Sequence, residues 1–277
     1  MSRASGGISL RGSSAEALTL LRDQLTEAIG RVGSRKTAEV GDDLLGLADV
    51  LRSEVALRRT VTDVSVDGEA KQSFVRSLFE GQVDPISVDL LAAAVAQRWT
   101  ATRDLPDTLE HLGVDTVVRS ADDAARVAVE LFEVGRLLAD HRDLRDTLAD
   151  PARTAQDKGD LLAGLLAGKT LSSTARLVRQ ALKGSYRTAG AALEAYQKVA
   201  AGVHGESVAQ VSVAEELPAA DRERLQAALA RQYGRPVHLN VVIDPDVIGG
   251  IRVEIGDDVI DGTVASRLDD ARRRLAG

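Results

Sequence analysis

Apolar residues recur at spacings of three and four through the first three quarters of the chain, with charged residues between them, which is typical of amphipathic helices. Leu18, Leu21, Leu25 and Ile29, for example, predict one helix that ends at the glycines that follow it. The predicted helices cover residues 15–29, about 42–59, 68–80, 87–99 and 105–118, and a further long helix opens at Asp122. Asp67 is the expected N-cap of the third helix, and Gly81 is its expected stop.

An internal repeat with an offset of 87 residues runs through these helices. Between Leu51 and Leu91, nine of 41 positions are identical to the residue 87 positions further on, and residues 57–63 match residues 144–150 most clearly. Shared helical composition explains the apolar matches, but it does not explain why the caps and stops also align without a gap. The repeat predicts a first helical copy over 15–118 and a second over 119–205. The second copy lacks a first helix of its own, and the helix over 15–29 is the candidate to supply it.

The period changes to two after Gly205. Ala209, Val211 and Val213 alternate as in a half-buried strand, a helix follows over about 218–233, and a second strand runs from Val237 to Ile243. This strand, helix and strand form a βαβ unit. A hairpin through Gly249 and Gly250 is expected to join the second strand to an antiparallel one over 251–255. A closing helix is predicted from the apolar residues Val264, Leu268, Ala271 and Leu275.

The predicted fold is therefore mainly α with a small C-terminal α/β module. Residues 1–14 are expected to form a flexible N-terminus, followed by an N-terminal helical bundle built as a tandem repeat of helices. Residues 206–277 form a small mixed sheet with flanking helices. The boundary between the helical part and the α/β domain is expected near residues 203–207, because the hydrophobic period changes there.

Composition limits the possible partners. The chain has 277 residues, a formal net charge of -7 and 3% aromatic residues, so it offers neither a broad positive field nor many stacking platforms for nucleic acid. It contains no cysteine, which excludes disulfides and thiolate metal sites. Apolar runs such as Leu90–Ala96 are far shorter than the roughly 18 residues of a membrane span. We therefore expect no nucleic-acid partner and no direct membrane insertion.

The search for catalytic motifs finds none that is complete. Phosphate-binding glycine loops and the H-E-x-x-H zinc motif are absent. His204-Gly205-Glu206 matches a fragment of zinc deaminases but has no thiolates to complete the site, and the segment around Ser207 lacks the last glycine of a nucleophile elbow. Adjacent aspartates such as Asp42-Asp43 are expected to be solvated caps and faces. Trp99 and His111 fall in predicted helices, where Trp99 is expected to pack. We expect no catalytic residue, no cofactor and no metal.

The C-terminal part carries a family resemblance. After a strand come Asp244-Pro245-x-x-Ile248-Gly249-Gly250, an alternating strand, Gly256-Asp257-x-Val-x-Asp261-Gly262 and an amphipathic terminal helix. This series resembles the subunit delta/OSCP family of F-type ATP synthases. The resemblance implies that nine residues of this series form a structural motif: Asp244, Pro245, Ile248, Gly249, Gly250, Gly256, Asp257, Asp261 and Gly262. The first helical copy departs from the shorter common form of the family.

The resemblance implies a non-catalytic stator subunit in the peripheral stalk of the proton-translocating ATP synthase. Such a subunit would link the N-terminal segments of the alpha subunits, on the catalytic head, to the membrane-anchored b subunit, so that rotation is coupled to ATP synthesis. It would lie at the cytoplasmic face of the cell membrane through the complex. Which helix pair binds alpha stays open. The alternatives are a generic helical adaptor and an enzyme whose site is assembled from scattered residues.

Overall fold

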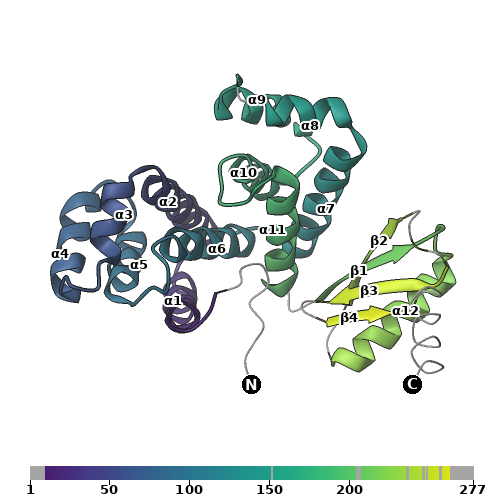
Figure 1. Ribbon diagram of the computed structural model, residues 1–277, viewed down its shortest axis with the longest axis horizontal. Helices are drawn as coiled ribbons and strands as arrows, with labels where there is room; N and C mark the ends of the chain where they lie inside the picture. The colour runs from purple at the N-terminus through teal and green to yellow at the C-terminus, as the bar shows by residue number, and fades with distance from the viewer. Residues whose placement is uncertain are drawn as a thin grey trace, which may run out of the picture. The chain divides into compact units, whose positions relative to one another are not determined.

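A computed structural model describes residues 10–150, 152–203, 207–234, 237–244, 247, 249–255 and 258–262. The chain divides between Val203 and His204 into a helical unit and a smaller C-terminal unit, and each is described here by itself. The predicted fold class is confirmed, because the described residues form many helices and one small mixed sheet near the C-terminus (Figure 1).

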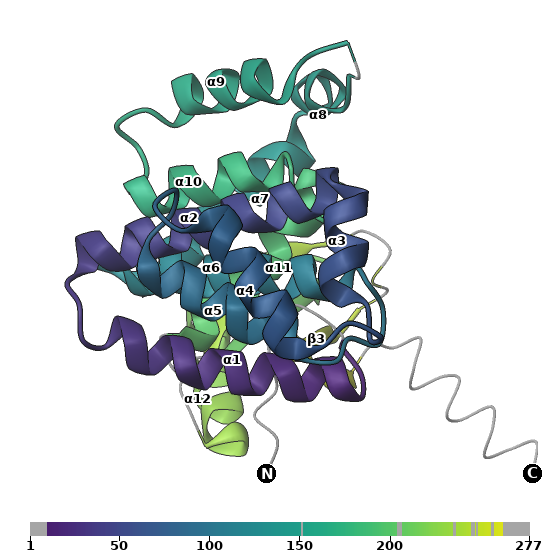
Figure 2. The ribbon, with the colours of Figure 1, turned by 90° about the vertical axis from the view of Figure 1, so that its left-hand side faces the viewer.

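The helical unit contains eleven helices in the described part of the chain. They are α1 (Ser13–Ile29), α2 (Ser34–Ser53), α3 (Val55–Thr62), α4 (Gly68–Phe79), α5 (Pro85–Ala96), α6 (Asp104–Arg119), α7 (Ala124–Asp140), α8 (Arg142–Ala149), α9 (Ala155–Leu166), α10 (Ser172–Ala181) and α11 (Ala189–Val203). Figure 2 shows α1 along one edge of this unit and α9 along the opposite edge.

The predicted helix over about 42–59 is wrong in its bounds. It is two helices, α2 and α3, which meet at Glu54, and α2 begins already at Ser34. The break is stabilised by Arg58, whose Nη1 donates to the carbonyl oxygens of Leu51 at 2.7 Å and Arg52 at 2.9 Å. These carbonyls have no helical partner at the end of α2, so the guanidinium satisfies them while the chain bends.

The predicted helix over 87–99 also ends earlier. α5 stops at Ala96, so Trp99 lies beyond it, where its buried indole donates from Nε1 to the Ala94 carbonyl at 3.0 Å. The predicted cap of α4 is confirmed, because the Asp67 carboxylate accepts from the backbone N–H groups of Glu69 and Ala70. Gly81 follows the helix with φ +78°, a conformation that favours glycine.

The 87-residue offset predicted from the sequence also relates the observed elements. Adding 87 to the bounds of α3 and α4 gives the bounds of α8 and α9, and α5 and α10 begin at equivalent residues. Arg145 repeats the bond of Arg58, since its Nη1 donates to the Leu138 carbonyl at 3.1 Å. Gly168 repeats the positive φ of Gly81 at +70°. We call α1–α6 the first copy and α6–α11 the second copy.

Helix α6 belongs to both copies. Its residues Leu105, Leu109 and Leu112 lie in the first hydrophobic core, together with buried residues of α1, α2 and α5. Its residues Val114, Val117 and Val118 lie in the second core, with buried residues of α7, α10 and α11. In Figure 1, α6 lies between α2 and α11. The second copy therefore takes its first helix from α6, and the expectation that the helix over 15–29 supplies it is wrong, because that helix packs in the first core.

The C-terminal unit is a four-stranded sheet with one described helix. It contains β1 (Ser207–Val213), α12 (Ala219–Tyr233), β2 (Val237–Ile243), β3 (Ile251–Ile255) and β4 (Asp258–Asp261). The order is β2-β1-β3-β4, with β1 parallel to β2 and the other neighbours antiparallel. Leu229 of α12 packs with Ala209, Val211 and Val253 of the sheet.

Two predictions for this unit are wrong. Residues 237–243 and 251–255 do not form a hairpin, because β1 lies between β2 and β3. Residues 258–261 form the edge strand β4, whereas the sequence pattern from Gly256 to Gly262 is interpreted as a turn between the last predicted strand and the closing helix. The alternating pattern identified the strands, but it carries no information about which strand lies beside which. The predicted closing helix lies outside the described residues.

Candidate functional site

Most described residues of the C-terminal motif gather at one end of the sheet. The Asp244 amide donates to the Val213 carbonyl at 2.8 Å, and the Gly262 amide donates to the Ile251 carbonyl at 2.9 Å. Gly249 and Gly250 lie between them in chain order with φ +66° and +81°. These bonds and backbone angles shape the connections between strands, so the motif supports the fold at this end of the sheet.

The remaining motif residues are placed less completely. Asp261 ends β4 and pairs in register with Arg252 of β3. Pro245, Ile248, Gly256 and Asp257 lie outside the described residues. Among the residues that the structure describes, no cluster of three or more histidine, aspartate or glutamate side chains could hold a metal ion.

A buried carboxylate connects the two helical copies. Glu110 of α6 pairs with Arg52 of α2, from the first copy, and accepts a hydrogen bond from the hydroxyl of Tyr196 in α11, from the second copy. Ser185 donates to the same carboxylate from its amide at 3.2 Å and from its hydroxyl at 2.8 Å. A side chain at Gly184 would collide with this carboxylate, so glycine lets the α10–α11 loop close over it. We call Glu110, Arg52, Ser185 and Tyr196 the polar joint.

The two tyrosines near the polar joint, Tyr186 and Tyr196, are neutral, and Tyr196 donates to Glu110. Burial, followed by the charge of Glu110, raises the pKa of Tyr196 far above its ordinary value. The same two causes raise the pKa of Tyr186 to about 12. The two rings contact each other edge to face with centroids 5.8 Å apart. The sequence reasoning missed this cluster, although a glutamate inside an apolar helix is the signal that could have indicated it.

A second acidic position is repeated in the two copies. Asp43 of α2 accepts from the Asp84 amide at 2.8 Å and from the Ser87 hydroxyl at 3.0 Å. At the positions 87 residues further on, Glu130 accepts from the Leu171 amide at 2.8 Å and from the Thr174 hydroxyl at 2.6 Å. Each acid thus binds the amide of the N-cap residue and a first-turn hydroxyl of the fifth helix of its copy. The sequence predicts solvated caps and faces at Asp42-Asp43; Asp42 is exposed, whereas Asp43 is half-buried and binds the start of α5.

His111 lies deep in the helical unit and contacts a cation. Its Nε2 is 2.5 Å from Nη2 of Arg22 in α1. Burial, followed by the charge of Arg22, lowers the pKa of His111 to about 3. The imidazole is therefore neutral at physiological pH and accepts from the guanidinium, a structural role.

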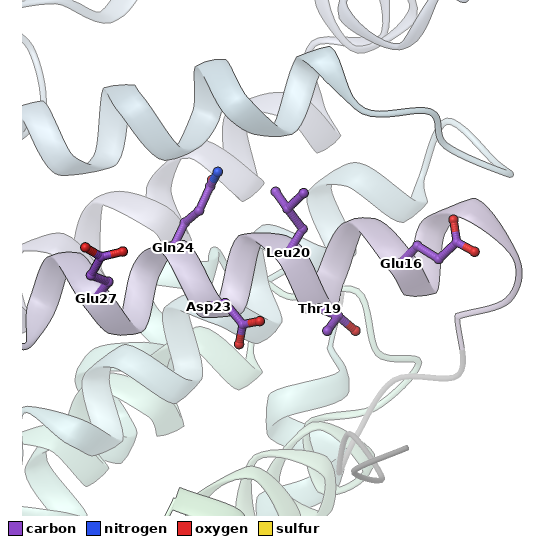
Figure 3. Close-up of a pocket in the computed structure, with 6 residues that line it drawn as sticks. All are labelled: Glu16, Thr19, Leu20, Asp23, Gln24 and Glu27. Carbon is purple, nitrogen blue, oxygen red and sulfur yellow. The ribbon is translucent and has the colours of Figure 1, made fainter. Parts of the chain in front are cut away.

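The outer face of α1 is an exposed acidic surface. A shallow hollow runs along it, lined by Glu16, Thr19, Leu20, Asp23, Gln24 and Glu27. Figure 3 shows Leu20 and Gln24 on one side of the helix and Thr19 and Asp23 on the other. The lining includes three carboxylates, no basic side chain and the exposed apolar side chain of Leu20. We call these six residues the α1 face.

Comparison with known proteins covers both units. Residues 116–275 match the family model described as ATP synthase delta (OSCP) subunit. The ATP synthase subunit delta of a Nocardioides species is 56% identical over 275 residues, which cover 97% of this chain and 98% of that protein. The subunit delta of Streptomyces coelicolor is 40% identical, with 96% and 98% covered.

The subunit delta of Kineococcus radiotolerans is 42% identical over 86% of this chain and 88% of that protein. The family model begins within α6, so most of the first copy lies outside it. The alignments with the Nocardioides and Streptomyces proteins extend over nearly the whole chain, first copy included. No helix among the described residues is long and apolar enough to cross a membrane.

Proposed function

Because the chain belongs to the ATP synthase delta (OSCP) subunit family, it is a non-catalytic peripheral-stalk subunit of an F-type ATP synthase, and we propose that it ties the alpha subunits to the b subunit. The near full-length similarity to subunits delta carries this conclusion. It does not favour the generic adaptor or the scattered-site enzyme. We further propose that the chain acts at the cytoplasmic face of the cell membrane, to which the complex attaches it.

The proposed task is mechanical. A stator must keep the catalytic head from turning with the rotor, so its contacts have to persist under repeated torque. Nanomolar or tighter binding corresponds to about -12 kcal/mol, and stable interfaces bury roughly 1,200 Å² or more. Amphipathic helices that offer grooves to partner helices suit such contacts.

We assign head binding to the helical unit, at the α1 face and the neighbouring helix α5. The carboxylates of Glu16 and Asp23 attract a partner of positive charge, and the exposed Leu20 offers it an apolar contact. Glu27 continues this acidic row and pairs with Arg31, just beyond the end of α1. On α5, Asp89 is also exposed, and its carboxylate pairs with Arg76 of α4 at 2.5 Å. This combination fits a basic amphipathic helix, and we propose that an N-terminal segment of an alpha subunit supplies it.

We assign b binding to the C-terminal unit. Both edge strands of its sheet carry exposed apolar side chains, Ile243 on β2 and Val259 and Ile260 on β4. Apolar side chains exposed at sheet edges are suited to a protein partner. The unit follows the helical unit after Val203, so the two proposed contacts fall on separate units.

Removal of residues 207–277 tests this division. The truncation crosses no helix of the helical unit, so the shortened chain should still bind the head. Membranes that carry it should keep ATP hydrolysis, while proton-driven ATP synthesis is lost because the tether to b is missing. The control is the full chain reconstituted in parallel. Normal ATP synthesis by the truncated assembly, with the fragment shown to be incorporated, would contradict the proposal.

A further inference from the structure

Helix α2 of the first copy lies across two helices of the second copy, α6 and α10. Toward α10, Asp42 pairs with Arg176 at 3.3 Å, and Asp49 accepts from Nε2 of Gln180 at 3.1 Å. Asp49 also lies 3.9 Å from the ammonium of Lys183, just beyond α10. These polar side chains link α2 to α10 and to the residue Lys183 that follows it.

The contact of α2 with α6 is closer. A Cβ at Gly41 would lie 2.7 Å from Cγ2 of Val117, and a Cβ at Gly113 would lie 2.8 Å from Cδ2 of Leu45. The two backbones therefore approach through glycines. Near the end of α2, Arg52 reaches Asp107 at 3.2 Å and also pairs with Glu110. Together these contacts cover the face of the second copy that α6 and α10 form.

The corresponding face of the first copy is open. Subtracting 87 from Arg176, Gln180 and Lys183 gives Asp89, Ala93 and Ala96 of α5. The difference is clearest at the middle position, because Gln180 is buried beside α2 whereas Ala93 is half-exposed. α6 is the first helix of the second copy, and its side away from that copy is covered by the first copy. α1 is the first helix of the first copy, and its side away from that copy is the exposed α1 face.

We propose that α2, a helix of the same chain, occupies the face of the second copy that α6 and α10 form. The equivalent face of the first copy, formed by α1 and α5, stays open for a partner. The helical unit then binds one partner helix, although it contains two copies. This inference rests on the proposed function, because the partner helix is the alpha-subunit segment assigned above to the α1 face.

Helix α2 cannot leave this face without a large loss of packing. Five apolar residues of α2 are buried in the first core: Val40, Leu44, Leu47, Ala48 and Leu51. If α2 released α6 and α10, it would have to expose these side chains to water or carry the first copy with it, and exposing several fully buried aliphatic side chains is strongly unfavourable. A second partner helix therefore has no access to the covered face.

Isothermal titration calorimetry of the full chain tests the inference. The probe is a synthetic peptide with the N-terminal sequence of the alpha subunit of the same ATP synthase. We expect one peptide bound per chain. The double variant Asp23→Lys/Glu27→Lys should weaken binding at least about tenfold. The matched control is Glu133→Lys/Asp160→Lys, which reverses two exposed carboxylates of the second copy and should leave the dissociation constant within about twofold.

A cross-link makes the test independent of charge. The chain has no cysteine, so Asp42→Cys and Arg176→Cys introduce a unique pair of thiols between α2 and α10. Joining them with a short bismaleimide should leave one peptide bound with unchanged affinity. A fall in stoichiometry on cross-linking would show that α2 opens to admit a peptide, which would overturn the inference.

The remaining outcomes separate the inference from the proposed function. Two peptides per chain would overturn the inference and leave the proposed function standing. One peptide whose binding ignores the α1 variants would also overturn it, because the occupied face would then lie elsewhere. No binding at all would instead contradict the assignment of head binding to the helical unit. Circular dichroism of each variant checks that the helices are retained.

Discussion

Replacing Glu110 by alanine should destabilise the helical unit strongly, because it removes the acceptor shared by both copies. The carboxylate accepts from Ser185 and Tyr196 and neutralises Arg52, and its side chain is only 2% exposed. Removing one partner of a buried ion pair costs about 3–5 kcal/mol, since the remaining charge is left without compensation. Asp107 and Asp49 stay near Arg52 at 3.2 and 3.6 Å, so we expect about 3 kcal/mol, the lower end of that range.

The assay is urea unfolding of the full chain at pH 7, followed by far-ultraviolet circular dichroism. Glu110→Gln keeps the shape of the side chain and one acceptor oxygen, so it should cost less, about 1–3 kcal/mol. The control is Glu194→Ala, which breaks an exposed pair with Lys198 at 2.8 Å and should cost at most about 0.5 kcal/mol. If Glu110→Ala unfolds within about 1 kcal/mol of the parent, the polar joint does not hold the copies together as argued.

Three further predictions concern packing, backbone and charge. Gly41→Ala should destabilise the helical unit by about 1–3 kcal/mol in urea unfolding, because the new methyl group collides with Val117. The control Gly46→Ala, on the same helix, meets open space and should stabilise the unit by about 0.5–1 kcal/mol. Equal effects of the two variants would refute the close approach of α2 and α6. Gly250→Val should lower the melting temperature of the C-terminal unit, because φ is +81° at this residue and a β-branched side chain there costs roughly 1–3 kcal/mol. A melting temperature within a degree of the parent would contradict this turn geometry. Burial lowers the pKa of His111 from its ordinary 6.5 to about 3 in the folded chain, so below about pH 6.5 the unfolded chain binds the extra proton. Stability should therefore fall as the pH drops below about 6.5, by up to about 1.4 kcal/mol per pH unit. His111→Gln should remove this part of the pH dependence of urea unfolding, and an unchanged profile would argue against a buried neutral imidazole.

Local signals in the sequence identified the elements that local chemistry determines. Asp67 caps the start of α4 and Gly81 follows its end, as predicted. A cap and a positive φ depend only on residues within a few positions in sequence. The early start of α2 was missed because its first residues, from Ser34 onward, are mostly polar and show no apolar stripe. The break at Glu54 depends on Arg58 reaching back to two carbonyls, which no periodicity records.

The pattern of apolar and polar residues could not predict contacts between residues that are distant in sequence. The partners of Glu110 lie 58, 75 and 86 residues away, so only a folded chain brings them together. The neighbour of β3 was mistaken for the same reason, since alternation defines a strand without defining its partner. The sequence does contain a sign that α6 packs in both cores. Leu109 packs in the first core and Val117 in the second, so this helix is apolar on both sides. The family motif, by contrast, was readable because its residues are close in sequence.

The sharing of α6 sets a rule for how such a chain can grow or shrink. Two six-helix bundles that were merely joined would need twelve helices, but the described helical unit has eleven, because the last helix of one bundle serves as the first of the next. Each additional bundle would therefore require five helices, an increment close to the 87-residue offset. Insertion or loss of one increment leaves both ends of the series as they were, with α1 at the start and α11 before the sheet. The helical unit could therefore lengthen or shorten by whole bundles without any change to α1 or α11.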